Sequence, residues 1–246
     1  MWNDDAGLAH KLVSGDFRMW CGGTANGDPV RGAGDLAQFV GRYQREQGVR
    51  FTPRVVVADG QAQRLAYTWD AAFPDGSVVG GIDVYTLRDG LISENWSLAG
   101  ERAASIPDDH SHTDGPGPAS RADIDELCRA WSPMWNGGTA RTADIVSDDF
   151  RAWFGARRSA ADDLVGPAEL AAYVRRHRDG HDSLRFAKHR DPVIDVARQR
   201  AAFTWTATLP LADGEHRTLG GIDLFQITGR KLSRCWSVTG TRPFTF

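Results

Sequence analysis

The spacing of apolar residues changes along the chain from helical periodicity to short β segments, and this change occurs twice. The apolar positions of residues 123–136 lie three or four residues apart, which predicts a helix with one buried face. Helices are also predicted over residues 35–47 and 169–178, with a short one before Phe17. The β segments that follow the helix at 35–47 are residues 50–58, 63–73, 77–87 and 91–100. This order predicts an α+β fold in which helices pack on the concave face of a curved antiparallel sheet.

Asp-Gly pairs mark the predicted hairpin turns. Asp75-Gly76 and Asp89-Gly90 separate the later β segments of the first half, and Asp213-Gly214 repeats the first of these turns in the second half. Glycine favours such turns because it accepts the positive φ that they require. The two halves are therefore expected to share their hairpins.

The two halves also match in sequence. Residues 14–20 (SGDFRMW) match residues 147–153 (SDDFRAW), and residues 80–85 (GGIDVY) match residues 220–225 (GGIDLF). Further matches in the same order pair residues 66–69 with 202–205, and Trp96-Ser97 with Trp236-Ser237. A chain with this many ordered matches is predicted to contain one structural unit twice.

The repeat predicts a domain at residues 1–104, a linker at residues 105–120 and a second domain at residues 121–246. The linker is rich in Pro, Gly and Asp, a composition typical of connecting segments. The helix predicted at residues 123–136 has no counterpart in the first copy, where Met1 matches a position at which that helix already ends. We expect that an upstream start was lost or that the first domain is built without this helix.

Composition and charge exclude several classes of protein. The 246 residues are 41% hydrophobic and 25% charged, as in ordinary globular proteins. With 29 Lys and Arg against 32 Asp and Glu, the net charge of -3 does not favour binding to nucleic acid. No apolar run approaches the ~18 residues of a membrane span, and no signal peptide is recognisable, so a cytoplasmic protein is expected. Cys21, Cys128 and Cys235 are too widely spaced for a structural zinc site and are expected to be reduced thiols.

The order of the motifs resembles the nuclear transport factor 2-like superfamily. The shared features are a helix ending in Trp-Asn, a DFxxW segment, a helix opening with Gly-x-x-[Asp/Glu]-Leu, a GGID strand, a DG turn and a Trp strand. Residues 82–96 look like the last hairpin of SnoaL-like polyketide cyclases. The resemblance covers nearly the whole chain, twice, and implies two tandem cone-shaped domains. It leaves the reaction open, because this fold hosts isomerases, cyclases, epoxide hydrolases, dehydratases and binding modules.

The resemblance also implies how the two copies meet. Domains of this superfamily usually dimerise through the outer face of the sheet, so a covalent tandem suggests an internal pseudo-dimer. Trp96 and Trp236 are then expected in that interface or beside it. If Asp83 faces inward, alternation along the hairpin by analogy places Asn95 and Ser97 inward and Trp96 outward.

Asp83 and Asp223 are the main catalytic candidates. Each lies in the middle of an apolar strand, where burial is expected to raise the pKa of its carboxyl group. Their position resembles that of the oxyanion-hole acid in the related steroid isomerases, which stays neutral at pH 7. The alternative is an aspartate satisfied by backbone amides or by an arginine.

Asp70 is a third catalytic candidate. If Asp75-Gly76 forms a two-residue turn, Thr68 lies opposite Asp83 and Asp70 shares their face. Two neighbouring carboxyl groups would then separate into an acid and a base. A turn one residue longer would point Asp70 away to solvent.

The remaining candidates are expected to contact a substrate, and each has a structural alternative. Arg18 and Arg151 could bind an acidic or enolate group or be ordinary strand-edge residues, and Cys21 could line the cavity mouth. Indole rings could stack on a planar ligand or fill the core, namely those of Trp20, Trp153, Trp69 and Trp205. The complete set of predicted substrate-binding residues is Arg18, Trp20, Cys21, Thr68, Asn95, Ser97, Arg151, Trp153, Thr204 and Ser237.

Several departures from the family narrow the chemistry. The catalytic base of the steroid isomerases falls on Cys21 and Phe154, and Ser97 and Ser237 stand where many SnoaL-like members have an aspartate. His177 and His181 have helical spacing, but Gly180 lies between them and no HExxH motif is present, so no metal site is expected. No nucleotide-binding loop precedes a helix, so no cofactor is expected either.

The residues together predict a cofactor-independent acid/base enzyme, a cyclase or dehydratase. Its substrate is expected to be an apolar oxygenated small molecule such as a polyketide or a similar secondary metabolite. Asp83, with or without Asp70, would transfer protons in the first copy and Asp223 in the second. The alternatives are a non-catalytic small-molecule binding protein of the same fold, a scaffold whose Trp side chains fill the cavities, an epoxide hydrolase or an isomerase.

Overall fold

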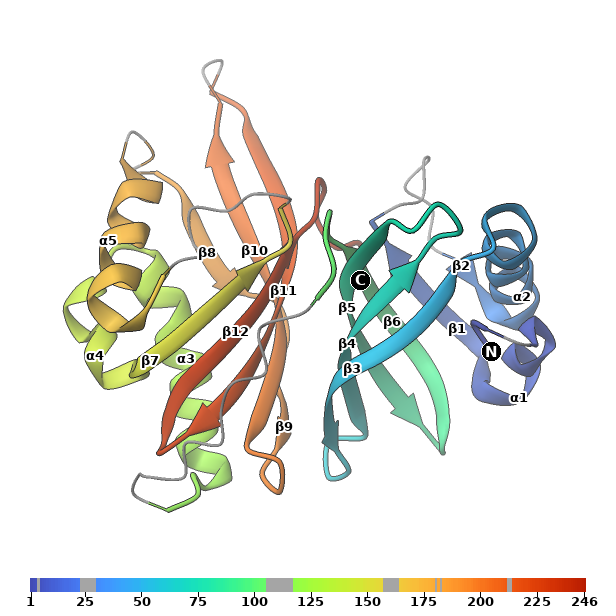
Figure 1. Ribbon diagram of the computed structural model, residues 1–246, viewed down its shortest axis with the longest axis horizontal. Coiled ribbons are helices and arrows are strands. Elements are labelled where there is room, and N and C mark those ends of the chain that lie inside the picture. The colour runs from blue at the N-terminus through green and yellow to red at the C-terminus, as the bar shows by residue number, and fades with distance from the viewer. Residues whose placement is uncertain are drawn as a thin grey trace.

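Two curved sheets lie back to back in the centre of the molecule, and helices lie on their outward sides (Figure 1). The first domain is blue to green in Figure 1 and the second is yellow to red. The structure is a computed structural model that describes residues 1–3, 5–22, 30–104, 117–156, 164–179, 181, 183–211 and 214–246. Most of the predicted linker, together with Gly180 and Asp213, lies outside these residues. The predicted α+β architecture with two tandem domains is confirmed.

The first domain forms a six-stranded sheet in the order β2-β1-β6-β5-β4-β3. Its elements are η1 (Ala6–Leu8), α1 (Ala9–Leu12), β1 (Val13–Cys21), β2 (Val30–Arg31), α2 (Gly32–Arg42), the π-helical turn η2 (Tyr43–Gln47), β3 (Arg50–Asp59), β4 (Arg64–Ala72), β5 (Val78–Arg88) and β6 (Leu91–Ala99). These bounds agree closely with the helix and the four β segments expected from the sequence.

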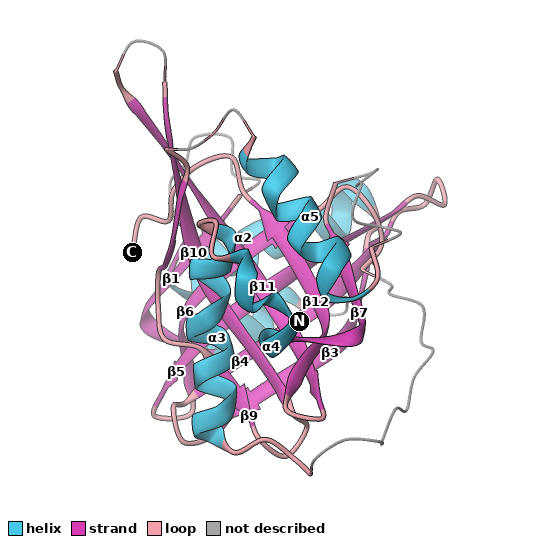
Figure 2. Ribbon diagram, turned by 90° about the vertical axis from the view of Figure 1, so that its left-hand side faces the viewer, coloured by secondary structure: helices cyan, strands magenta, loops and turns pink. Residues whose placement is uncertain are grey.

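The second domain repeats this plan and adds a long helix. Its elements are α3 (Arg121–Trp135), η3 (Thr139–Arg141), α4 (Thr142–Ile145), β7 (Val146–Phe154), α5 (Gly166–Arg178), β8 (Arg185–Lys188), β9 (Val193–Asp195), β10 (Arg200–Pro210), β11 (His216–Thr228) and β12 (Lys231–Thr239). The sheet order is β7-β12-β11-β10-β8, with β9 also paired to β10. From the side of this domain, α3, α4 and α5 lie in front of the strands (Figure 2).

The DFxxW segment forms a strand in each copy. The pairs β1 with β6 and β7 with β12 are parallel, whereas the other described pairs are antiparallel. The expected antiparallel sheet therefore carries one parallel pair in each domain. Parallel pairing is possible here because a helix and further strands separate β1 from β6 along the chain.

Helix α3 begins where a capping box satisfies its first amides. The Ser120 side chain accepts a hydrogen bond from the Asp123 backbone amide, and the Asp123 side chain accepts one from the Ser120 amide. The buried face of the helix packs against the sheet through Ile124, Leu127, Trp131 and Met134. No described residues of the first domain form a helix at the corresponding place. Within the described residues, no helix is both long enough and apolar enough to cross a lipid bilayer.

The outer faces of the two sheets share one apolar core. Four of the nine tryptophans lie in it, with Trp96 beside Trp20 in one sheet and Trp236 beside Trp153 in the other. Smaller apolar residues of both domains fill the space between the rings, namely Val57, Ala66, Ile82, Val84, Leu98, Ala104, Val193, Ala202, Ile222, Leu224 and Val238. The domains are therefore joined by a continuous core as well as by the linker.

Polar contacts between the domains are reciprocal. Asp59 of the first domain accepts a hydrogen bond from the Ile194 amide at 3.1 Å, and Asp195 of the second accepts one from the Ala58 amide at 3.0 Å. Trp20 Nε1 donates to the Pro243 carbonyl of the second domain at 3.1 Å. In the matching contact, the indole of the equivalent Trp153 donates to the Ala103 carbonyl at 2.8 Å. Equivalent residues thus make equivalent contacts in both directions, as in a twofold interface.

Substitution of Trp96 by alanine tests the shared core. Trp96 is 1% exposed, and its loss is expected to lower the free energy of unfolding by about 3–5 kcal/mol. Because its ring lies between the sheets, amides of both domains should lose protection in hydrogen-exchange mass spectrometry. Leu91→Ala, on the same strand but 36% exposed, should cost less than about 0.5 kcal/mol. Loss of protection confined to the first domain would contradict a shared core.

Candidate functional site

Each domain holds a tryptophan against a glycine on the inner face of its sheet. Trp69 on β4 pairs with Gly81 on β5, and Trp205 on β10 pairs with Gly221 on β11. A Cβ atom at Gly81 would lie 2.1 Å from the Trp69 ring, and one at Gly221 would lie 2.0 Å from the Trp205 ring. The second glycine of each GGID motif therefore provides the space that the indole occupies.

Each of these indoles donates to the aspartate two residues beyond the glycine. Trp69 Nε1 lies 2.9 Å from Asp83 Oδ1, and Trp205 Nε1 lies 2.9 Å from Asp223 Oδ1. Glycine and aspartate share one face because side chains two residues apart along a strand point to the same side. Both aspartates are buried, at 3% and 4% exposure.

The second oxygen of each aspartate has a different donor in the two domains. Asp223 Oδ2 accepts a hydrogen bond from Trp131 Nε1 of α3 at 2.8 Å. Asp83 Oδ2 accepts one from the Tyr85 hydroxyl at 2.6 Å, and that hydroxyl lies 2.7 Å from the Tyr67 hydroxyl. The hydrogen bond to Oδ2 thus comes from a tyrosine of the sheet in the first domain and from a tryptophan of helix α3 in the second.

Burial is the dominant influence on both carboxyl groups. It raises the pKa of Asp223 to about 6, against the lowering effect of hydrogen bonds from Ser237, Trp205 and Trp131. Asp223 is therefore mostly ionised at pH 7 and takes up a proton just below that pH. Burial also raises the pKa of Asp83, opposed by its hydrogen-bonding neighbours Ser97, Tyr85, Trp69 and Tyr67.

The tyrosines near Asp83 remain neutral at physiological pH. Burial is the main cause that raises the pKa of Tyr67 and of Tyr85, and the neighbouring Asp83 charge adds to it. Both hydroxyls therefore keep their protons and can donate them in hydrogen bonds. Their rings stack with centroids 5.5 Å apart, and the Tyr85 hydroxyl lies within hydrogen-bond distance of both the Tyr67 hydroxyl and the Asp83 carboxylate.

Both aspartates lie on the walls of cavities. The first cavity has a volume of about 540 Å³ and the second of about 530 Å³, sizes typical of small-molecule sites. Aromatic residues on the walls of the first include Trp2, Phe39, Tyr43, Phe51, Tyr67 and Trp69. Those of the second include Trp131, Trp135, Phe154, Tyr173, Phe186 and Trp205. The scaffold alternative, in which the Trp side chains fill both cavities, is therefore wrong.

The structure brings several predicted site residues to these cavities. Cys21 and Ser97 line the first cavity with Asp83, and Ser237 lines the second with Asp223. Asn95 shares the inner face, where it is paired with Tyr85 and buried, while Trp96 faces outward as expected.

The expected alignment of Thr68 and Asp70 with Asp83 is wrong. The connection between β4 and β5 is five residues long, so Tyr67 pairs with Asp83 and Thr68 pairs with Ile82. A shift of one residue moves every side chain of a strand to the other face. Asp70 lies on the outer face, but in place of solvent it contacts Arg54 at 2.6 Å and the Ala104 amide at 2.6 Å.

Thr204 follows the same register in the second domain. It pairs with Ile222, faces away from Asp223 and contacts His189 Nδ1 through its hydroxyl at 3.0 Å. Thr68 accepts a hydrogen bond from the Val55 amide at 3.1 Å. Neither threonine is among the lining residues of the two cavities, so the structure does not bring them to the aspartates.

Two tryptophans and two arginines predicted for the sites also lie on the outer faces. Trp20 and Trp153 belong to the core between the domains. Arg18 pairs with Glu94 at 2.5 Å and lies over the Phe246 ring, which is the structural alternative for this residue. Arg151 is exposed, and its neighbour in the strand register of β7 and β12 is Arg234. None of these four residues lines either cavity.

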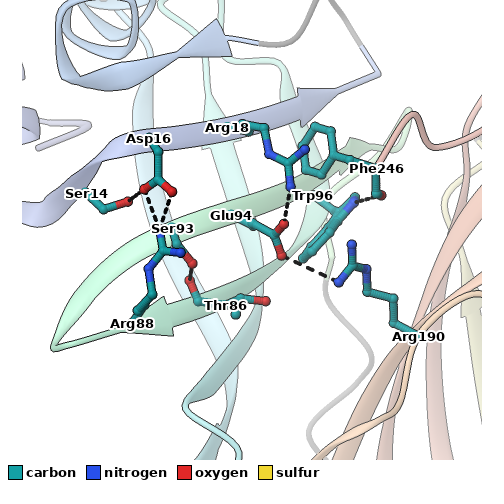
Figure 3. A network of polar contacts seen from close by, with 10 residues as sticks. All are labelled: Ser14, Asp16, Arg18, Thr86, Arg88, Ser93, Glu94, Trp96, Arg190 and Phe246. Atoms are coloured by element: carbon teal, nitrogen blue, oxygen red, sulfur yellow. Dashed lines mark hydrogen bonds and ion pairs between the residues drawn. The ribbon is translucent and has the colours of Figure 1, made fainter.

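The contacts of Arg18 extend to the second domain. Glu94 lies between Arg18 of its own sheet and Arg190 of the second domain, whose guanidinium is 3.6 Å away (Figure 3). The Arg190 guanidinium also lies over the Trp96 ring, 4.7 Å from its centroid. Arg18 thus contributes to the contact between the domains.

The described residues hold no group of three or more His, Cys, Asp or Glu side chains suited to a metal ion. His177 lines the second cavity and stacks on Tyr173, whereas His181 is not among the lining residues. Partial burial lowers the pKa of His177, so its imidazole is neutral at pH 7. Within the described residues, no disulfide bond involves Cys21, Cys128 or Cys235.

The hydroxyl donors of the first site were not expected from the sequence, because no motif indicated Tyr67 or Tyr85. The pairing of a tryptophan with the second glycine of GGID was a usable signal, since both copies carry it at matching positions. The contact of Trp131 with Asp223 joins residues 92 apart, which spacing along the chain cannot reveal.

The sequence matches no protein-family model and no curated protein. Solved structures are similar in fold to about half of the chain. TsrD from Streptomyces laurentii is 20% identical, with a TM-score of 0.40 over 49% of this chain and 90% of its own. A SnoaL-like polyketide cyclase from Agrobacterium tumefaciens is 15% identical, with a TM-score of 0.38 over 47% and 90%. An NTF2-like protein of unknown function from Cytophaga hutchinsonii is 7% identical, with a TM-score of 0.40 over 49% and 99%. At these identities the similarity concerns the fold alone.

Substitution of Gly221 by alanine tests the contact between tryptophan and glycine. The added methyl group would overlap the Trp205 ring, so the indole must move and its bond to Asp223 must lengthen. We expect a loss of about 1–3 kcal/mol in the free energy of unfolding. Gly60→Ala is the control, because no heavy atom lies within 4 Å of its Cβ position. Equal thermal stability of the two variants would show that the indole does not depend on the glycine.

The pH dependence of stability tests the protonation of Asp223. A carboxyl with a folded-state pKa of about 6 and an unfolded value of 3.8 favours the folded state below pH 4, and this contribution is lost as pH rises through 6. Wild type should therefore lose roughly 2.4 kcal/mol relative to Asp223→Asn between pH 4 and pH 7, measured by urea denaturation.

The pKa of Asp59 is shifted in the opposite direction to that of Asp223, so its contribution to stability changes with pH in the opposite direction. Burial raises the pKa of this carboxyl, but hydrogen bonds from Arg121 and two backbone amides outweigh it and lower the pKa below 3.8. The stability that Asp59 contributes is present above pH 4 and is lost as pH falls below it. A wild-type profile parallel to that of Asp223→Asn between pH 4 and pH 7 would contradict the raised pKa of Asp223.

Proposed function

We propose that the protein is a cofactor-independent acid/base enzyme, a cyclase or dehydratase, that acts on an apolar oxygenated small molecule such as a polyketide. One observation carries the proposal. In each domain a buried aspartate, oriented by fixed hydrogen-bond donors, lies on the wall of an apolar cavity of about 530–540 Å³. A carboxyl group with a pKa near the working pH can both accept and return a proton during a reaction.

In the second cavity, ionised Asp223 would remove a proton from a substrate carbon next to a carbonyl group. The electron pair of that C–H bond would form an enolate, which either attacks a second carbonyl or expels a neighbouring hydroxyl as water. The protonated carboxyl group then returns its proton to the new alkoxide or to the departing hydroxyl. Trp131 and Trp205 hold the two carboxylate oxygens throughout, so the base is oriented before the substrate arrives.

In the first cavity, Asp83 would act with a hydroxyl donor. Tyr67 lines this cavity, and its raised pKa keeps its hydroxyl protonated. A hydroxyl there can donate to a substrate oxygen on which negative charge develops. Asp70 takes no part in the proposal, because it lies on the outer face with Arg54.

The two domains would work as an internal pseudo-dimer. Reciprocal contacts support this arrangement. Asp59 and Asp195 each accept a hydrogen bond from a backbone amide of the other domain, and Trp20 and Trp153 each donate one to a backbone carbonyl of the other domain. The two sites can then differ in chemistry while sharing one scaffold.

A non-catalytic binding protein is the second candidate. Both oxygens of Asp223 already accept indole hydrogen bonds, which makes the carboxylate a stable part of the wall without any substrate. In a binding protein the aspartates could be replaced with no turnover to lose. Epoxide opening of the Asp-Arg-Asp type is less favoured, since the described lining of both cavities includes no arginine.

Turnover of 5-nitrobenzisoxazole tests whether a carboxylate in an apolar cavity can remove a proton from carbon. Removal of its C3 proton breaks the N–O bond and releases a coloured cyanophenolate. The Asp83→Asn/Asp223→Asn double variant should lose about 100-fold or more in kcat/KM. In the Asp83→Asn background, the rate should fall as pH decreases through about 6, because protonated Asp223 is no base.

Asp16→Asn is the matched control, because Asp16 is an exposed carboxylate paired with Arg88 far from either cavity wall. It should leave turnover and its pH profile unchanged. Equal rates for wild type and the double variant would reject proton transfer by these aspartates and favour the binding protein.

A further inference from the structure

The buried acids of this protein fall into two groups according to their partners. Those on the outer faces and at the contact between the domains pair with arginines. These pairs are Asp59 with Arg121 at 2.7 Å, Asp70 with Arg54 at 2.6 Å, and Asp195 with Arg198 at 2.9 Å. Asp83 and Asp223 make no ion pair within the part of the chain that the structure describes, and neutral groups donate to them. The two buried aspartates on the cavity walls thus have no cationic partner among the described residues.

A buried carboxylate without a cation is costly, because neutral donors replace only part of its hydration. The other titratable groups near Asp223 do not neutralise it. Burial raises the pKa of Cys128 on α3 and of Cys235 on β12, so both thiols stay uncharged at pH 7. His177 on α5 is neutral as well, and the described lining includes no lysine or arginine. The described lining of this cavity therefore offers Asp223 no positive charge at neutral pH.

Aromatic rings form much of the wall of the second cavity. Trp135 packs against Phe186 at 5.5 Å, His177 at 5.8 Å and Tyr173 at 6.1 Å between ring centroids. Trp131 and Trp205 hold their rings beside the Asp223 carboxylate. Aromatic rings attract cations through the negative potential of their faces, most strongly in desolvated sites. The rings thus add to the attraction that Asp223 exerts on a positive charge.

We propose that the second cavity binds a ligand in which an apolar ring system carries a protonated nitrogen, and that this ammonium group pairs with Asp223. The ligand supplies the cation that arginines supply to the other buried acids. The ring system fills the aromatic part of a cavity of about 530 Å³. This narrows the substrate class of the proposed function to amine-bearing molecules, and it excludes anions of the same shape. In the first cavity the Tyr85 hydroxyl donates to Asp83 at 2.6 Å and Tyr67 lies beside it, so the inference concerns the second cavity alone.

Three probes of one shape and different charge test the inference. They are 1-naphthylmethylamine, which is protonated at pH 7.5, 1-naphthalenemethanol, which is neutral, and 1-naphthoate, which is an anion. Isothermal titration calorimetry of the full chain should give a Kd at least 10-fold lower for the amine than for the alcohol. The anion should bind more weakly than the alcohol. Equal affinities for amine and alcohol would overturn the inference.

Variants assign the preference to one carboxylate. Asp223→Asn should bring the Kd of the amine to that of the alcohol, whereas Asp83→Asn should leave the 10-fold preference intact. A preference that survives in Asp223→Asn would overturn the inference. The two variants make the same change in the two cavities, so each is the control for the other.

Wild-type protein gives a second test that needs no substitution. A bound ammonium group favours ionised Asp223, so binding at pH 6 should release protons, which titrations in buffers of different ionisation enthalpy measure. The preference for the amine should shrink below pH 6, where free Asp223 is protonated. Binding without proton release at pH 6 would overturn the inference even if Asp223→Asn does not fold.

The outcomes separate this inference from the proposed function, with which it shares Asp223. An amine preference without turnover of 5-nitrobenzisoxazole would support the inference and reject the acid/base enzyme. Turnover that depends on Asp223, without an amine preference, would do the reverse.

Discussion

The buried carboxylate of Asp223 requires donors on both oxygens, and most features of the second domain serve that requirement. Gly221 leaves room for the Trp205 indole, which lies against the strand and donates to one oxygen. Helix α3 brings Trp131 to the other oxygen. The same two indoles form part of the apolar wall around the carboxylate. They raise the free-energy cost of its negative charge by keeping it from water, and their N–H groups offset part of that cost by donating hydrogen bonds to it.

The two domains meet the same requirement with different side chains. Four tryptophans hold the domains together, and the other five lie at the cavities, where Trp69, Trp131 and Trp205 donate to the aspartates. Without a described helix in the place of α3, the first domain uses Tyr85 on the strand of Asp83 itself. The shared core fixes the sheets, and the cavity walls are left free to differ. One duplicated unit thereby contains two sites of different electrostatic character.

The sequence predicted the helices and strands, the repeat and the burial of Asp83 and Asp223. It predicted the strand register correctly only between β5 and β6, where the resemblance to a family hairpin served as a guide. A two-residue turn at Asp89-Gly90 alone would pair Asp83 with Trp96; a register shift after Thr86 pairs it with Ser97, as the resemblance implied. No such guide existed before Val78, and a five-residue connection turned Asp70 to the outer face. Turn length decides the face, and an Asp-Gly pair does not specify turn length.

The central claim is that an ionisable carboxylate sits between two indole donors in an apolar cavity. The most direct measurement follows the indole Nε1–H resonances of uniformly ¹⁵N-labelled protein from pH 8 to pH 4. Trp131 and Trp205 should shift together with a midpoint of about pH 6, while Trp20, which donates to a backbone carbonyl, should not follow them. A common midpoint near pH 4, as for an ordinary aspartate, or no shift in either indole would contradict the account.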